Sequence, residues 1–203
     1  MYIHPPSQNE VISNSLRSHG IWEPESTEIV RAGLEEGQTF VDCGAHIGYY
    51  SLLASSIVGE TGRVIAFEPW KPNHDLLVEN IKLNGAKNIV PIMLPLWDSV
   101  TTLSIGQGSD NTGDVRVSAT EGVLTVLSTT LDLLFSPNTV DFLKIDCQGV
   151  DPKILRGGRR LISGSEKIKV LVEDHGGVMD ELGLRSVKQI PREQTWFFVK
   201  GDV

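Results

Sequence analysis

The chain alternates between continuous apolar runs and segments with helical spacing of apolar residues. Residues 47–58 and 71–85 show the helical spacing, and the second has Pro72 near its start and Gly85 at its end, as helices often do. The runs between them have the length of buried strands. The runs are 38–44, 63–69, 140–146 and 167–174. This alternation predicts an α/β fold, a mostly parallel sheet with helices on both faces.

Three further segments depart from the alternation. Residues 88–96 form a strand-like run with two prolines, and proline confines a strand to the edge of a sheet. Short alternating runs between Ser99 and Val126, joined by GQGSDNTGD, predict an antiparallel insertion whose loop carries Asp110 and Asn111 and could cover a substrate. Residues 184–200 have the pattern of a closing hairpin.

Length and composition indicate one globular domain. The 203 residues are 40% hydrophobic and 22% charged, which suffices for a single core. We expect an N-terminal arm or cap over residues 1–37 and the main domain over residues 38–203. No apolar run approaches the roughly 18 residues of a membrane-spanning helix, and the first residues lack a secretion signal. A cytoplasmic protein, not integral to a membrane, is therefore expected.

The charge balance bears on the partner. The chain has 26 acidic and 18 basic residues, for a net charge of -8. Proteins that bind nucleic acid usually carry a basic stripe, and the basic cluster around Arg156, Arg159 and Arg160 is short. We therefore expect a small-molecule partner and no nucleic acid. The sequence predicts no particular oligomeric state.

Acidic residues follow the ends of four predicted strands. They are Asp42, Glu68, Asp146 and the pair Glu173 and Asp174. In an open α/β sheet the ligand crevice lies outside the carboxyl ends of the strands. The acids are therefore expected to converge on one edge of the sheet.

The stretch FVDCGAHIGYYS predicts a strand, a tight turn and a helix start that receive a polar ligand. Gly44 and Gly48 let the backbone approach a ligand, and Glu68 follows at the spacing of an acid that accepts hydrogen bonds from an adenosine ribose. A dinucleotide loop would need G-x-G-x-x-G, which is absent. An acid before the first glycine repels a pyrophosphate but suits the amino group of methionine. S-adenosylmethionine is thus favoured over a nicotinamide dinucleotide.

Six motifs together resemble the FkbM-type family of S-adenosylmethionine-dependent methyltransferases. From about Gly20 to about Val199 they occur in the family's order and spacing: DCGAHIGYY, VIAFEP, NIKLNG, LWD, LKIDCQG and LVED. The resemblance implies a Rossmann-like, seven-stranded class I methyltransferase sheet with an antiparallel last strand. It also implies O-methylation of a hydroxyl on a small metabolite, sugar or lipid.

The resemblance also implies roles for matching residues. The methionine portion of the cofactor would be lined by Asp42, Gly44 and Gly48, and His46 would donate a hydrogen bond nearby. Glu68 would hold the ribose, Asp98 the adenine amine, and Trp70 and Trp97 could pack against adenine, although ordinary core packing explains both tryptophans equally well.

An alcohol acceptor must lose a proton, and a positioned base assists that step. The candidates are Asp146, which would also border the cofactor, then Glu173 and His175. Alternatively, Asp146, Glu173 and Asp174 could gather a divalent cation, which is possible but not favoured. Strand alternation turns Lys144 away from Ile145 and lets it pair with a neighbouring acid.

Two positions depart from the family pattern. Gln148 replaces an acid, which leaves open a second hypothesis, a non-catalytic S-adenosylmethionine-binding or partner protein. Asp151 replaces a glutamate, and with Pro152 it predicts an N-cap followed by the first helical residue. A nucleic-acid methyltransferase is disfavoured because no N-P-P-Y or D-P-P-Y run follows residues 140–146.

Overall fold

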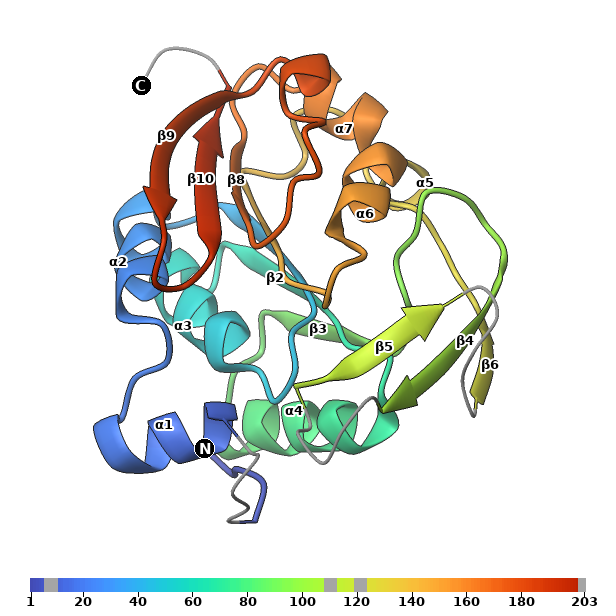
Figure 1. Cartoon of the computed structure of the whole chain (residues 1–203). Helices are drawn as coiled ribbons and strands as arrows, with labels where there is room; N and C mark the ends of the chain where they lie inside the picture. The colour runs from blue at the N-terminus through green and yellow to red at the C-terminus, as the bar shows by residue number, and fades with distance from the viewer. Residues whose placement is uncertain (6–10, 108–112, 119–123, 201–203) are drawn as a thin grey trace.

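A computed structural model describes residues 1–5, 11–107, 113–118 and 124–200, and it contains the predicted seven-stranded sheet (Figure 1). The strand order is β3-β2-β1-β7-β8-β10-β9. In that order the strands are Ile89–Ile92, Arg63–Phe67, Thr39–Cys43, Phe142–Ile145, Lys169–Val172, Thr195–Val199 and Arg185–Ile190.

The pairing confirms the predicted topology. Strands β3, β2, β1, β7 and β8 pair in parallel, whereas β10 pairs antiparallel with both β8 and β9. The strand that contains Pro91 is β3, and it lies at one edge of the sheet, as its proline predicts. The closing hairpin forms the other edge.

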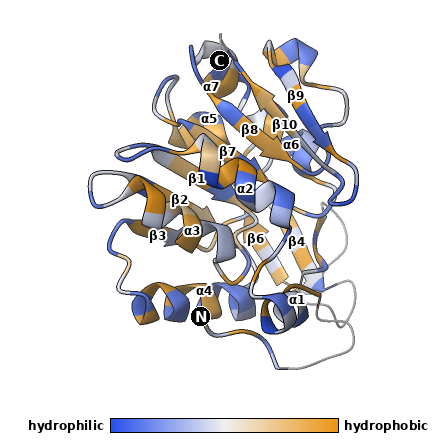
Figure 2. Ribbon diagram, turned by 90° about the vertical axis from the view of Figure 1, so that its left-hand side faces the viewer, coloured by the Kyte–Doolittle hydropathy of each residue, from blue (hydrophilic) through white to orange (hydrophobic). Residues whose placement is uncertain are grey.

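Helices cover both faces of this sheet. Helices α2 (Pro24–Gly33), α3 (Tyr49–Val58) and α4 (Lys71–Leu83) share one buried cluster with strand side chains. Helices α5 (Leu131–Leu134), α6 (Asp151–Gly157) and α7 (Arg159–Gly164) share the other. Figure 2 shows the hydrophobic strands between these helices.

The alternation of side chains along β1 explains how one strand serves two cores. Phe40 packs in the cluster with α3, while Val41 and Cys43 pack in the cluster with α6. All three side chains are fully buried. Each buried side chain of valine or phenylalanine size stabilises the fold by roughly 1.5–3 kcal/mol, so both faces contribute to holding the crevice edge in place.

The predicted insertion is a separate antiparallel sheet. Strand β4 (Thr102–Gln107) lies between β5 (Val115–Ser118) and β6 (Leu124–Leu127). Asp110 and Asn111, predicted to lie in its loop, fall outside the described residues. A short 3-10 helix, Asp180–Leu182, follows β8.

Several hydrogen bonds tie the N-terminal arm to the domain, among them those at α4 and at the turn between β9 and β10. Helix α1 (Val11–His19) lies next to α4 (Figure 1). Nearby, the Tyr2 N–H donates a hydrogen bond to the side-chain oxygen of Asn80 on α4, and the side-chain NH2 of Asn80 donates one to the Tyr2 carbonyl. At α2, the backbone N–H groups of Glu25 and Ser26 each donate 2.9 Å hydrogen bonds to the Glu193 carboxylate, in the turn between β9 and β10. These hydrogen bonds join the arm to α4 and to the turn between β9 and β10.

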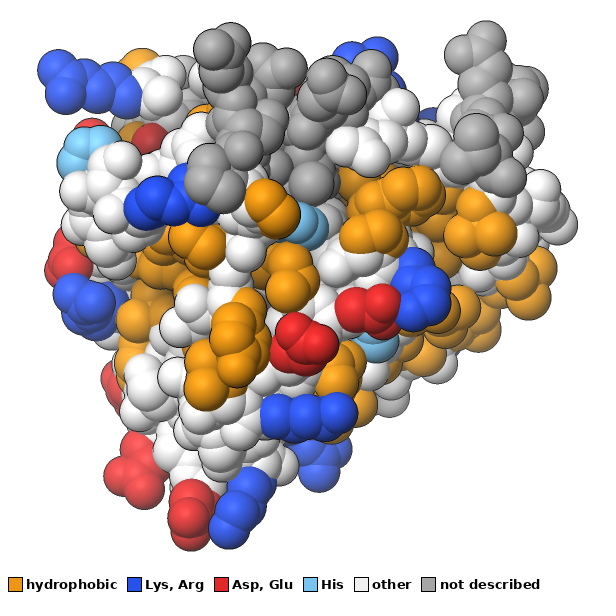
Figure 3. Space-filling model, turned by 90° about the horizontal axis from the view of Figure 1, so that it is seen from below, with side chains coloured by type: hydrophobic (Ala, Val, Ile, Leu, Met, Phe, Trp, Pro, Cys, Tyr) orange, Lys and Arg blue, Asp and Glu red, His pale blue; other side chains and the backbone are white. Residues whose placement is uncertain are grey.

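Surface and helix lengths add two observations. Within the described ranges, no helix combines the length and apolar character needed to cross a membrane. On the face shown in Figure 3, the Lys and Arg side chains of the described residues are scattered among acidic and apolar ones.

Candidate functional site

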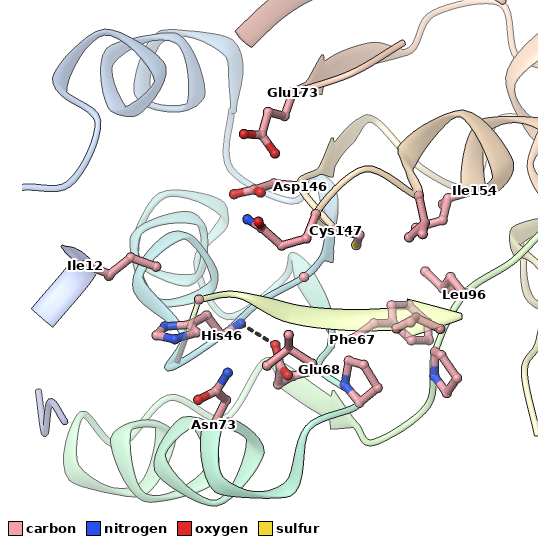
Figure 4. Close-up of a pocket in the computed structure, with 18 of the residues that line it drawn as sticks. Ile12, His46, Phe67, Glu68, Asn73, Leu96, Asp146, Cys147, Ile154 and Glu173 are labelled. Atoms are coloured by element: carbon pink, nitrogen blue, oxygen red, sulfur yellow. Dashed lines mark hydrogen bonds between the residues drawn. The ribbon is translucent and has the colours of Figure 1, made fainter. Parts of the chain in front are cut away.

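A pocket opens at the carboxyl ends of β1, β2, β7 and β8. It encloses about 1000 Å³ of space, the open solvent at its mouth included. Five of the predicted site residues line it: Gly44, His46, Glu68, Asp146 and Glu173. Figure 4 shows Asp146 and Glu173 at one end of the pocket and Phe67, Leu96 and Ile154 at the other. The predicted convergence of strand-end acids is therefore present for three of them.

The glycine turn brings bare backbone to the pocket wall. Gly44 has φ +82°, and a Cβ atom there would lie 2.0 Å from the carbonyl oxygen of Asp146. Gly48 has φ +92°, immediately precedes α3, and leaves room for the Leu77 side chain, which a Cβ would meet at 2.6 Å. Both positions need glycine for conformation and for space. The two glycines thus let the turn pack closely against Asp146, which follows β7, and against Leu77 of α4.

The buried carboxylate of Glu68 holds this turn through hydrogen bonds to backbone N–H groups. Its Oε2 accepts a hydrogen bond from the His46 N–H and its Oε1 one from the Trp70 N–H, each at 2.9 Å (Figure 4 draws the first). Burial raises the pKa of Glu68 to about 7, and the two backbone donors oppose that rise. A carboxylate oxygen can accept more than one hydrogen bond. Glu68 can therefore also accept hydrogen bonds from a ligand in the pocket.

Asp42 lies behind the pocket and is not among its described lining residues. Its carboxylate is fully buried, with Oδ2 accepting from the Ser51 hydroxyl at 2.7 Å and Oδ1 lying 3.4 Å from Lys144 Nζ. Lys144 also lies 3.4 Å from Asp146 Oδ2, which confirms the predicted pairing. Burial lowers the pKa of Lys144, but the adjacent carboxylates outweigh burial and raise it. Lys144 therefore stays charged between the two acids.

Asp146 and Glu173 form a carboxyl pair that faces the pocket. Figure 4 shows the two side chains directed toward each other. Burial raises the pKa of Glu173 to about 8, with the Asp146 charge and the hydrogen bond to Asp146 adding to it. A carboxyl that titrates near neutral pH can take up or release a proton under ordinary conditions.

Several predicted residues lie elsewhere. Among the described residues that line the pocket, Gly48, Trp70, Trp97, Asp98, Asp174 and His175 do not occur. The His175 ring packs against Trp196 and Phe198, with centroids 5.1 and 5.4 Å away. Trp97 lies under Lys153 Nζ at 4.7 Å, and Asp98 pairs with the same lysine at 3.5 Å. These residues stay predictions that the geometry does not test.

The described residues contain no group of three or more His, Cys, Asp or Glu side chains arranged to hold a metal ion. Asp174, one of the three candidate metal ligands, instead accepts a 2.9 Å hydrogen bond from the Gly176 N–H.

The predicted N-cap role of Asp151 is wrong. Asp151 is the first residue of α6, and its side chain caps none of the helix's own N–H groups. Its carboxylate instead accepts hydrogen bonds from Cys147 N–H at 2.8 Å and Asp174 N–H at 3.1 Å. A fully buried carboxylate needs such partners. Asp151 therefore joins the loops that follow β7 and β8.

The sequence did not predict several of the lining residues, among them those of the apolar end and those of the arm. The apolar end of the pocket has Phe67, Leu96 and Ile154, whose pattern is the same as that of core residues. The arm contributes Trp22 and Glu23, and Glu23 Oε2 accepts a 2.8 Å hydrogen bond from the Tyr50 hydroxyl. Glu23 is distant in sequence from every motif, so no local signal marks it.

Raised carboxyl pKa values predict a pH dependence of stability. The pKa of Glu68 rises from 4.5 to about 7 and that of Glu173 from 4.5 to about 8. Because the folded state then binds more protons than the unfolded chain, the free energy of unfolding should fall as pH rises from about 5 to about 8. Burial of Glu68 alone accounts for on the order of 3 kcal/mol. Urea unfolding across this interval measures the slope.

Glu68→Gln is the matched variant for this measurement. It keeps the side chain's size but cannot ionise, so its unfolding free energy should vary less with pH. A native protein whose stability rises between about pH 5 and about pH 8 would contradict the assignment, because the sign follows directly from the raised pKa values.

The chain is similar in sequence or in structure to several known proteins. The profile of the "Methyltransferase FkbM domain" matches residues 42–191. A curated Bacillus subtilis protein, "Uncharacterized protein YpiP", is 51% identical over 54 residues, a match that covers 26% of this chain and 21% of that protein. The chain therefore matches only about a fifth of that relative's length.

Two solved structures share the fold. A SAM-dependent methyltransferase from Aquifex aeolicus aligns over 92% of this chain and 90% of its own, with a TM-score of 0.52 and 17% identity. A SAM-dependent O-methyltransferase from Thermotoga maritima aligns over 98% of this chain and 72% of its own, with a TM-score of 0.57 and 16% identity. At these identities the likeness concerns the fold alone.

Proposed function

The chain belongs to the FkbM methyltransferase domain family, and we propose that it uses S-adenosylmethionine to methylate a hydroxyl group of a small molecule. The observation that carries this proposal is the pocket itself, in which a glycine turn, a buried strand-end glutamate and a carboxyl pair face one cavity. The family match supports the cofactor. The Asp146 and Glu173 pair supports a hydroxyl acceptor.

The pocket suits the cofactor by its chemistry and shape. Adenine is flat and apolar, and Phe67, Leu96 and Ile154 offer an apolar end. The ribose hydroxyls can donate hydrogen bonds, and the Glu68 carboxylate can accept them. Gly44 lines the pocket with backbone atoms alone, and the missing Cβ lets the turn lie against the Asp146 carbonyl.

These residues would hold the cofactor in sequence along the pocket. Phe67 and Ile154 would pack on adenine, Glu68 would bind the ribose, and the turn from Gly44 to His46 would border the methionine portion. Trp97 and Asp98 follow Leu96 in the chain, and their contacts with adenine stay predictions. Asp42 would act through Lys144, since it lies behind that lysine.

The bound cofactor supplies an electrophilic methyl group on a sulfonium. The chain's task is to hold the acceptor oxygen in line with it, and well-oriented geometry is worth roughly 7–11 kcal/mol. The acceptor hydroxyl must also lose its proton. Glu173, with its pKa near 8 and its neighbour Asp146, is placed to receive it. His175 is a less suitable base because its ring packs on Trp196 and Phe198 outside the described pocket lining.

Binding of S-adenosylhomocysteine, the demethylated product, tests the cofactor assignment. The native chain should bind it, and Glu68→Ala should bind it at least about tenfold more weakly, because hydrogen bonds to a charged group contribute about 1.5–3 kcal/mol. Isothermal titration calorimetry measures both affinities. NAD titrated in parallel should give no binding heat, because the glycine turn lacks a dinucleotide loop.

Glu166→Ala is the matched control for this experiment. Glu166 is exposed and lies outside the described pocket lining, so its loss should leave the affinity unchanged. No binding to the native chain would refute the proposed function. Binding without methyl transfer to any hydroxyl compound would favour the non-catalytic alternative, which the replacement of the family's acid by Gln148 first raised.

A further inference from the structure

Glu23 brings a carboxylate from the arm to the methionine end of the pocket. It lines the same cavity as Gly44 and Asp146, and it precedes α2 with a left-handed backbone at φ 41°. The Tyr50 hydroxyl on α3 donates a 2.8 Å hydrogen bond to its Oε2. This hydrogen bond holds one carboxylate oxygen in place, and the other oxygen can accept a hydrogen bond from a ligand.

The methionine portion of the cofactor carries an ammonium group, which a carboxylate matches best. Asp42 was the sequence candidate for this partner. In the structure its carboxylate is fully buried, bonded to Ser51 and adjacent to Lys144, and it is not among the described residues that line the pocket. Lys144 Nζ already lies 3.4 Å from Asp42 Oδ1, so an ammonium at Asp42 would meet a like charge.

We propose that Glu23 binds the ammonium group of the cofactor's methionine portion. This inference rests on the proposed function and deepens it. Glu23 lies outside residues 42–191, the segment that the family profile matches, so the family motifs do not assign it. Its side chain lines the same pocket as Gly44 of the glycine turn, and it lies close enough to Lys144 for that charge to lower its pKa.

A second contact holds this part of the arm in position. The Glu193 carboxylate accepts the backbone N–H groups of Glu25 and Ser26, and also the Ser26 hydroxyl at 2.5 Å. Glu25 and Ser26 are the second and third residues of α2, which begins at Pro24, directly after Glu23. The hairpin turn therefore fixes the start of α2, and Tyr50 fixes the side chain of Glu23.

The surroundings of Glu23 also predict a proton release. Burial and the Asp146 charge raise its pKa to about 7, Glu193 adds to the rise, and Lys144 and the Tyr50 hydroxyl oppose it. Binding an ammonium requires the ionised carboxylate. Below about pH 7, ligand binding should therefore release a proton from Glu23.

Two nucleosides separate the ammonium contact from the rest of the site. S-adenosylhomocysteine carries the amino-acid portion, whereas 5′-methylthioadenosine lacks it. By calorimetry, Glu23→Gln should weaken S-adenosylhomocysteine binding about 10- to 100-fold and leave methylthioadenosine binding unchanged. Near pH 6 the native protein should also release more protons on binding S-adenosylhomocysteine than on binding methylthioadenosine, measured in buffers of different ionisation enthalpy, and in the variant this difference should disappear.

Glu25→Gln is the matched control, since Glu25 lies two residues away but is exposed and pairs with Lys188 at 2.8 Å. It should bind both nucleosides as the native chain does. The inference is overturned if Glu23→Gln, with a native melting temperature, binds S-adenosylhomocysteine normally or loses both nucleosides equally. If the native chain binds neither nucleoside, the proposed function fails instead.

Discussion

Replacing Gly44 with alanine is expected to abolish measurable binding of S-adenosylhomocysteine. The added Cβ would lie 2.0 Å from the Asp146 carbonyl oxygen and 3.1 Å from Cys147 Sγ, and the backbone has φ +82°. The turn must move to relieve this contact, and movement displaces the His46 N–H that Glu68 holds. Calorimetry at ligand concentrations about 100 times the native Kd would measure a loss of at least about 100-fold.

Gly85→Ala controls for the cost of the left-handed backbone alone. Gly85 has φ +62°, and a Cβ there would meet nothing within 4 Å. It should lose roughly 1–2 kcal/mol of stability but bind the ligand normally. Circular dichroism shows whether Gly44→Ala is folded. A folded Gly44→Ala protein with native affinity would contradict the role given to the close backbone contact.

Removal of Lys144 is expected to cost the most stability of any single charge. Its Nζ lies 3.4 Å from carboxylate oxygens of both Asp42 and Asp146, and its side chain is 5% exposed. Lys144→Met fills the space but leaves buried negative charge without a partner, which typically costs about 3–5 kcal/mol. Urea unfolding near neutral pH measures the difference.

The double variant Asp42→Asn with Lys144→Met isolates the ion pair. Removing both charges should restore part of the lost stability, because no unpaired charge then remains at Asp42. The single variant should also lose less stability at acid pH, where protonation neutralises its carboxylates. A Lys144→Met protein as stable as the native chain near pH 8 would show that the lysine is dispensable.

Most of the fold could be predicted because local signals and tertiary placement agree. Strand β7 has buried apolar side chains on both faces, Phe142 on one and Leu143 and Ile145 on the other, as expected for a strand in the middle of the sheet with helices on each face. Pro91 marked an edge strand, and β3 is one. Residues 184–200 contain the antiparallel hairpin that closes the sheet. In each case the residues that favour the local strand conformation also determine where the strand lies in the sheet.

The site was harder to predict because an acid just after the last residue of a strand lines the pocket, whereas an acid one residue before the strand's end lies in the core. Glu68 and Asp146 come directly after the last residues of β2 and β7, so their side chains reach the crevice. Asp42 comes before the end of β1, where Cys43 continues the strand, and it lies beside Lys144 in the sheet register. The sequence places all three near strand ends, but strand length decides their surroundings.

Residues from distant segments could not be predicted at all. Phe67 and Ile154 have the same apolar pattern whether they face a ligand or the core. Glu23 reaches the pocket only because the arm packs on α3, through the Tyr50 hydroxyl. Asp151 carries a helix-start signature, yet burial between two loops gives its carboxylate other partners. Tertiary contact overrides the local pattern in each case.

The hydrogen bonds between Glu193 and the start of α2 join residues 167 and 168 positions apart. A ribosome therefore synthesises Glu23 early and the residue that anchors its helix late. The nascent chain can build β1 to β8 and the glycine turn beforehand, but the arm gains this anchor only after the C-terminal hairpin emerges. The contact thus joins two parts of the chain that lie on either side of the segment matched by the family profile, and that are synthesised before it and after it.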